Sequence, residues 1–126
     1  MENIYLPARE RSPEVDFRFT ENHLSLRGEA YPEDAASFFG PLLKALASHC
    51  ESIHGRELRV DFQLIYFNTS SAKALMNLIQ ILEATASDGT RVVIRWLVQE
   101  DDDVMREFGE DFSGELKNVH FELIQI

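Results

Sequence analysis

The sequence predicts an α/β fold: one domain, residues 1–126, with a mixed, mostly parallel β-sheet in the order β-β-α-β-α-β-α-β. Three observations support this prediction. Short stretches of period-two hydrophobicity open the chain, helical periodicity appears after Tyr31-Pro32, and strand-like and helix-like runs then alternate to the end. Strands that alternate with helices imply right-handed crossovers, and therefore a mostly parallel sheet.

The first part of the chain predicts an antiparallel hairpin. Residues 1–13 are polar, contain two prolines, and are expected to form an extended N-terminal arm. "VDFRFT" (15–20) and "HLSLRG" (23–28) both alternate apolar and polar side chains, as half-buried strands do. The polar pair Glu21-Asn22 between them indicates the turn.

A helix is predicted from about Pro32 to Ile53, with Pro32 in its first turn. Its apolar face recurs every three or four residues: Ala35, Phe39, Leu42, Leu46, Cys50 and Ile53. Gly40-Pro41 interrupts this run, and an interior proline costs about 3 kcal/mol. We therefore expect a kink there, or two shorter helices in tandem.

The second half predicts three further strands and two helices. "ELRVDFQLIYF" (57–67) is a central strand whose second face becomes apolar at Ile65 and Phe67, which predicts cover on both sides at that end. The segments that follow are a helix over 70–86, a turn at Asp88-Gly89, a strand over 91–98, an acidic helix over 100–112 and a strand over 119–126.

Charge and composition argue against several classes of partner and location. The net charge of −10, from 12 basic and 22 acidic residues, disfavours nucleic acid and anionic membrane surfaces as partners. The acidic segment 100–111 is either a solvated face or a patch for a basic partner. No apolar run is long enough to span a bilayer, no secretory signal opens the chain, and Cys50 is the single cysteine. These features predict a cytoplasmic protein without a disulfide.

No motif indicates catalysis. The four histidines lack metal-ligand spacing, and the chain has no phosphate-binding loop, dinucleotide fingerprint or GxSxG elbow. Cys50 follows His49 late in an amphipathic helix, where a small core residue is expected. We therefore predict a protein that is not an enzyme and has no metal or cofactor.

Four consecutive polar residues, Asn68-Thr69-Ser70-Ser71, separate the central strand from the helix that follows it. Such residues are preferred helix N-caps. One residue is enough for a cap, however, so at least one hydroxyl is surplus and expected to be exposed. A phosphate placed there would meet the positive end of a helix and could control association while leaving the fold intact.

This arrangement, with a hydroxyl at the strand-to-helix turn, resembles the STAS domains of anti-sigma-factor antagonists. The local sequence is closer still to the SiaC family of bacterial regulatory phosphoproteins. Three segments carry that resemblance: "LSLRGEAYPEDAASFFGPLL", "LIYFNTSSAKALMNLIQILEA" and "VIRWLVQEDDDVMREFGEDF". It covers most of the chain and implies a STAS-like single domain.

The resemblance implies a switch. Thr69 matches the phosphoacceptor of the family's NTSS motif, with Ser70 and Ser71 as alternatives. A Ser/Thr protein kinase and a PP2C-type phosphatase would control the phosphate. The unphosphorylated form would bind a GGDEF diguanylate cyclase and promote cyclic di-GMP synthesis and biofilm growth. Leu97-Val98 stand where many relatives carry aromatic residues, which affects the expected partner surface.

The expected partner-binding residues are Asn68, Ser70, Lys73 and Met76, all within two helical turns of Thr69. Three other functions remain open from the sequence. The chain could be an anti-sigma-factor antagonist, or a small ligand-binding protein or enzyme that uses a pocket beside Tyr66. In the third reading it is a passive scaffold in which Thr69 only caps a helix.

Overall fold

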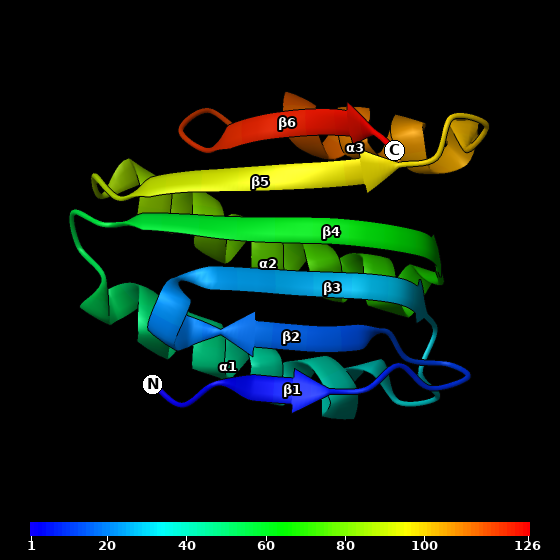
Figure 1. Cartoon of the computed structure of the whole chain (residues 1–126), viewed down its shortest axis with the longest axis horizontal. Coiled ribbons are helices and arrows are strands. Elements are labelled where there is room, and N and C mark those ends of the chain that lie inside the picture. Colours follow the sequence, from blue (N-terminus) through cyan, green and yellow to red (C-terminus); the bar gives the residue numbers. More distant parts are fainter.

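Six strands form one sheet in the computed structural model, which describes residues 1–126 (Figure 1). The spatial order of the strands is their order along the chain. The first three are antiparallel neighbours, and the last four are parallel. The strands are β1 (Ile4–Leu6), β2 (Glu14–Arg18), β3 (His23–Ala30), β4 (Glu57–Phe67), β5 (Arg91–Val98) and β6 (His120–Gln125). The prediction of a mixed, mostly parallel α/β sheet is confirmed.

Strand β1 lies within residues 1–13, for which the sequence predicts only an extended arm. Ile4 pairs with Phe17 and Leu6 with Val15, which places β1 at the antiparallel edge of the sheet. Three residues are too few for alternation to be visible in the sequence. The sheet therefore has one strand more than predicted.

All three helices lie on one face of the sheet (Figure 1). They are α1 (Ala35–Ser52), α2 (Thr69–Ser87) and α3 (Asp103–Gly114), and each connects two parallel neighbours. Right-handed crossovers between strands that follow one another in space place every helix on the same side. A cluster of 27 buried hydrophobic residues fills the space between helices and sheet. None of the helices is both long and apolar enough to cross a membrane.

Helix α1 begins later than predicted and is continuous. Its N-cap is Asp34, whose carboxylate accepts a hydrogen bond from the Ser37 N–H at 3.1 Å, so Pro32 precedes the helix. The helix runs through Pro41 to Ser52, and the alternative of two tandem helices is wrong. Gly40 and Pro41 lie on its exposed side, where the loss of one backbone hydrogen bond is tolerated because water can replace it.

The carboxyl end of β4 differs from the prediction because of a β-bulge. Gly28 pairs with Leu64 and Glu29 with Tyr66, which leaves Ile65 as an extra residue. The bulge turns Phe67 onto the helix face, where its ring lies 4.7 Å from that of Phe108. Ile65 and Tyr66 are 59% and 50% exposed. The expectation that helices cover both faces at this end is therefore wrong.

Candidate functional site

The turn Asn68–Ser71 lies where β4 ends and α2 begins (Figure 1). The last residue of β3, Ala30, accepts a hydrogen bond from the Asn68 N–H at 3.2 Å, which fixes the turn to the neighbouring strand. In parallel sheets, binding sites gather at the carboxyl ends of the strands. The predicted switch region is thus at the expected end of the sheet.

Asn68, and not a hydroxyl, caps α2. Its side-chain oxygen accepts a hydrogen bond from the Ser71 N–H at 2.9 Å, and its main-chain oxygen accepts the Ala72 N–H at 2.8 Å. One residue therefore satisfies the cap. The hydroxyls of Thr69 and Ser70 are left exposed, as the sequence predicted.

The three hydroxyl residues differ in access. Thr69 is the first helical residue and is exposed, as is Ser70. Ser71 is fully buried, and its hydroxyl has no hydrogen-bond partner. A kinase that needs the hydroxyl in its own active site can reach Thr69 or Ser70 directly, whereas Ser71 first requires the helix to open.

Beside this turn, α1 and α2 enclose a groove of about 890 Å³. Ser70 and Lys73 line it from α2, and Glu33 and Asp34 from the N-terminal end of α1. Lys73 is the one basic residue of this lining, and it forms no ion pair. Hydrogen bonds from Ser37 lower the pKa of the Asp34 carboxyl, so Asp34 keeps its negative charge at neutral pH.

Met76 does not share this groove. It is partly buried and lies in a smaller hollow between α2 and α3, with Ile79, Phe112 and Leu116. Ser70 and Lys73 face α1 instead. The structure therefore brings Ser70 and Lys73 together in the groove beside α1, places Met76 in the hollow beside α3, and uses Asn68 as the cap of α2.

Exposed apolar side chains occur at the same end of the sheet, where the sequence predicted that Ile65 would be covered. Ile65 and Tyr66 lie just before the last residue of β4, Val104 is the second residue of α3, and Ile126 follows β6. Figure 1 shows the start of α3 and the C-terminus at the carboxyl ends of the parallel strands. The Tyr66 ring meets that of Tyr31 edge-on, with centroids 5.7 Å apart. Only the bulge exposes Ile65 and Tyr66 together, and nothing in the sequence indicates a bulge.

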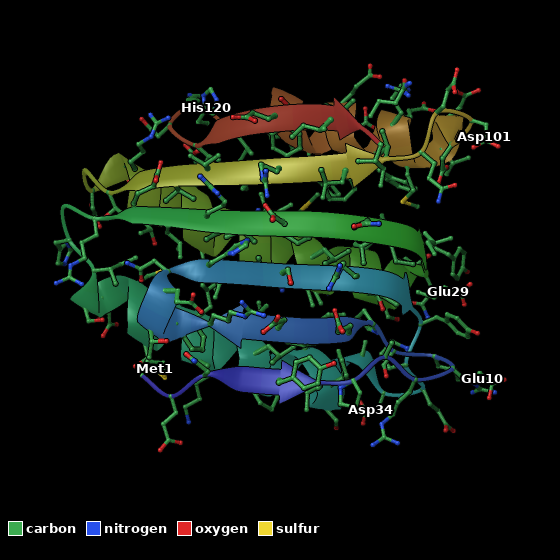
Figure 2. The ribbon with its side chains drawn as sticks, viewed as in Figure 1. Met1, Glu10, Glu29, Asp34, Asp101 and His120 are labelled. Atoms are coloured by element: carbon green, nitrogen blue, oxygen red, sulfur yellow. The ribbon has the colours of Figure 1, made fainter.

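The uncovered face of the sheet is polar, and its side chains appear as sticks in Figure 2. At its centre Asp61 accepts hydrogen bonds from Arg95 at 2.8 and 2.7 Å, and it lies 2.9 Å from the His23 ring nitrogen. Burial alone would raise the pKa of Asp61, but the hydrogen bonds from Arg95 and His23 outweigh burial and lower it. This network ties β3, β4 and β5 together.

No cluster of three or more His, Cys, Asp or Glu side chains is placed to hold a metal ion. Cys50 is 7% exposed, and burial raises the pKa of its thiol, which keeps it protonated and unreactive. Cys50 is thus a core residue, as predicted.

Comparison with known proteins gives the family. The model of the SiaC family regulatory phosphoprotein matches residues 6–126. An uncharacterized protein of Pseudomonas aeruginosa strain UCBPP-PA14 is 29% identical over 112 residues, which span 89% of this chain and 88% of that protein.

Comparison with solved structures leads to the same family. SiaC of Pseudomonas aeruginosa superposes with a TM-score of 0.92 and 26% identity, and covers 100% of both chains. A crystal structure of the diguanylate cyclase SiaD in complex with its activator SiaC, from the same species, matches with a TM-score of 0.91 and 26% identity, over 98% of this chain and 99% of that chain. The family is one of regulatory proteins rather than enzymes, as the sequence predicted. The chain belongs to the SiaC family of regulatory phosphoproteins.

Proposed function

We propose that this protein is a non-catalytic signalling adaptor, switched by reversible phosphorylation of Thr69. In the unphosphorylated form it binds and stimulates a GGDEF diguanylate cyclase, and so controls cyclic di-GMP and biofilm growth. The observation that carries the proposal is the exposed Thr69 hydroxyl at the first residue of α2, which the Asn68 cap leaves unused. The complex of SiaD with its activator SiaC supports the choice of partner class.

The physical basis of the switch is charge added at a helix N-terminus. A phosphate brings about −1.5 to −2 charges at neutral pH. The positive end of the α2 dipole favours that charge, so the fold tolerates the modification. A partner that covers Thr69 would have to remove water from the new dianion, and burial of an unpaired charge is costly.

The partner surface that we propose joins two kinds of residue. Ser70 and Lys73 would supply polar contacts from the groove, and Asn68, which precedes Thr69 and caps α2, would supply a third. The exposed Ile65 and Tyr66 supply apolar area at the same end of the sheet. Met76, two turns along α2 from Thr69 and beside α3, would contact only a partner that extends along the helix toward α3.

The proposal includes a Ser/Thr protein kinase and a PP2C-type phosphatase as further partners, and a cytoplasmic location where ATP and GTP are available. Thr69 is preferred to Ser70 because it matches the family's phosphoacceptor, and to Ser71 because Ser71 is buried. We also propose that the α/β domain is STAS-like in its fold.

The test is a quantitative pull-down from native lysate with four baits: wild type, Thr69→Ala, Thr69→Asp and Ser48→Asp. Ser48 is exposed on α1 and controls for the added charge. We expect every bait except Thr69→Asp to capture a diguanylate cyclase, with at least a tenfold loss for Thr69→Asp, equivalent to about 1.4 kcal/mol. The purified cyclase should then be stimulated by the same three proteins.

Two results would count against the proposal. Equal capture of the cyclase by Thr69→Asp and wild type would remove the switch. Capture of a sigma-regulatory kinase alone would favour the anti-sigma-factor antagonist.

A further inference from the structure

We propose that Lys73 is the intramolecular counter-ion of a phosphate on Thr69, so that phosphorylation changes the charge of the groove between α1 and α2, which Lys73 lines. This inference rests on the proposed function, since it takes Thr69 as the acceptor. It assigns to Lys73 a role in the phosphorylated protein itself, distinct from contact with a partner.

The geometry of α2 places the two side chains together. Thr69 is the first helical residue and Lys73 the fifth, and both are exposed. Side chains at positions i and i+4 are surface neighbours, with Cβ atoms about 5–6 Å apart. Helical side chains also tilt toward the N-terminus, which favours contact between the Lys73 side chain and a group carried by Thr69. An anion that precedes the cation by four residues is the favourable order for such a pair.

Lys73 is available for this role because no other anion holds it. The ion pairs of the chain are all formed by arginine or histidine. Of the two acidic residues across the groove, Asp34 already accepts hydrogen bonds from the Ser37 main chain and hydroxyl, at 3.1 and 2.8 Å. A phosphate dianion on Thr69 would therefore meet a free ammonium group one turn away.

The acidic surroundings of Thr69 increase the need for a positive charge to compensate the phosphate. The chain carries a net charge of −10, and Figure 2 shows Glu29 and Asp101 at the end of the sheet where the parallel strands finish. A dianion added there is repelled by acidic neighbours, and Lys73 is the one basic residue of the adjoining groove. Pairing with the phosphate would also draw the Lys73 charge away from Glu33 and Asp34. Phosphorylation would thus add negative charge at the turn and remove positive charge from the groove.

The phosphate's own titration tests the pair directly. Phosphothreonine is placed at position 69 during translation, and its phosphorus NMR shift is followed against pH in wild type, Lys73→Met and Lys44→Met. Lys44 is exposed on α1, does not line the groove, and controls for the lost charge. In water the second pKa of such a phosphate is about 6. We expect Lys73→Met to raise it by about 0.3, a twofold change in the ionisation constant, relative to both other proteins.

Identical titration of Lys73→Met and wild type would overturn the inference, as would equal shifts in Lys73→Met and Lys44→Met. Because phosphothreonine is built in, the result does not depend on any kinase. A Lys73-specific shift in a protein whose Thr69 no cellular kinase modifies would leave the inference standing and remove the proposed function. If Lys73→Met titrates like wild type while Thr69→Asp loses the cyclase, the inference about Lys73 is removed and the proposed function stands.

Discussion

At the scale of single residues, the assignment of the α2 cap to Asn68 changes what a threonine substitution should do. Asn68 provides the side-chain acceptor for the Ser71 N–H, and the Thr69 hydroxyl provides none. Asn68→Ala should therefore lower the free energy of unfolding by about 1 kcal/mol. Thr69→Ala should change it by less than about 0.5 kcal/mol, as exposed substitutions usually do. Urea unfolding of both variants measures the difference.

A loss of about 1 kcal/mol in Thr69→Ala would instead support the passive-scaffold hypothesis, in which Thr69 is only a cap.

The helix cap shows what the sequence could and could not predict about the site. It predicted surplus hydroxyls, because four polar residues exceed the need of one cap. It could not choose the capping residue, since Asn, Thr and Ser have similar cap preferences and only the backbone at Asn68, with φ −87° and ψ 177°, decides.

At the scale of elements, the close approach of α3 to the sheet depends on Gly109. A Cβ atom there would lie 2.5 Å from Trp96 Cδ1 and 3.0 Å from Leu123 Cδ1. The Trp96 ring is held in place because its N–H donates to the Met105 carbonyl oxygen at 2.8 Å. Gly109→Ala should cost about 1–3 kcal/mol by overpacking, against about 1 kcal/mol gained in helix propensity. A net loss of up to about 2 kcal/mol is expected in thermal or urea unfolding.

Gly114→Ala is the matched control, because nothing lies within 4 Å of a Cβ at that end of α3. It should be neutral or slightly stabilising, through helix propensity alone. If the two alanine variants unfold alike, α3 can move away from the sheet, and the close packing at Gly109 is not needed.

The length of each helix and strand explains which of them could be predicted from the sequence. The three helices and five longer strands carry enough turns or alternations for their periodicity to be recognised. Strand β1 has three residues and no such signal. The bulge at Ile65 is invisible for a different reason: it depends on how β4 pairs with Gly28 and Glu29, more than 30 residues away. Long-range pairing of this kind has no local signature, although it exposes the apolar residues nearest to Thr69 in the sequence.

At the scale of the whole molecule, stability should fall in mild acid because of one buried imidazole. His49 is 6% exposed and lies 4.7 Å from the Phe19 ring. One ring nitrogen is 2.7 Å from the Asn22 side-chain oxygen, to which it must donate, and the other has no partner. Protonation would place a hydrogen on that second nitrogen without an acceptor. Burial accordingly lowers the pKa of His49 from its ordinary value of 6.5.

A lowered folded-state pKa means that the unfolded chain binds the proton more readily. The His49 contribution to stability is therefore complete above pH 6.5 and is lost as the pH falls below that value. The loss cannot exceed about 1.4 kcal/mol per pH unit for one group. Asp61 does not interfere in this window: its lowered pKa gives a contribution that disappears only near and below pH 4.

The measurement is the urea midpoint of wild type and His49→Gln at pH 7.5, 6.5 and 5.5. Wild type should lose stability between pH 6.5 and 5.5, and His49→Gln should lose markedly less, even if it is less stable at pH 7.5. The 22 acidic residues act in the opposite direction, because acid relieves their mutual repulsion, and this effect is common to both proteins. Parallel pH profiles for the two proteins would show that the imidazole accepts its proton without cost, and hence that the packing around His49 opens to water.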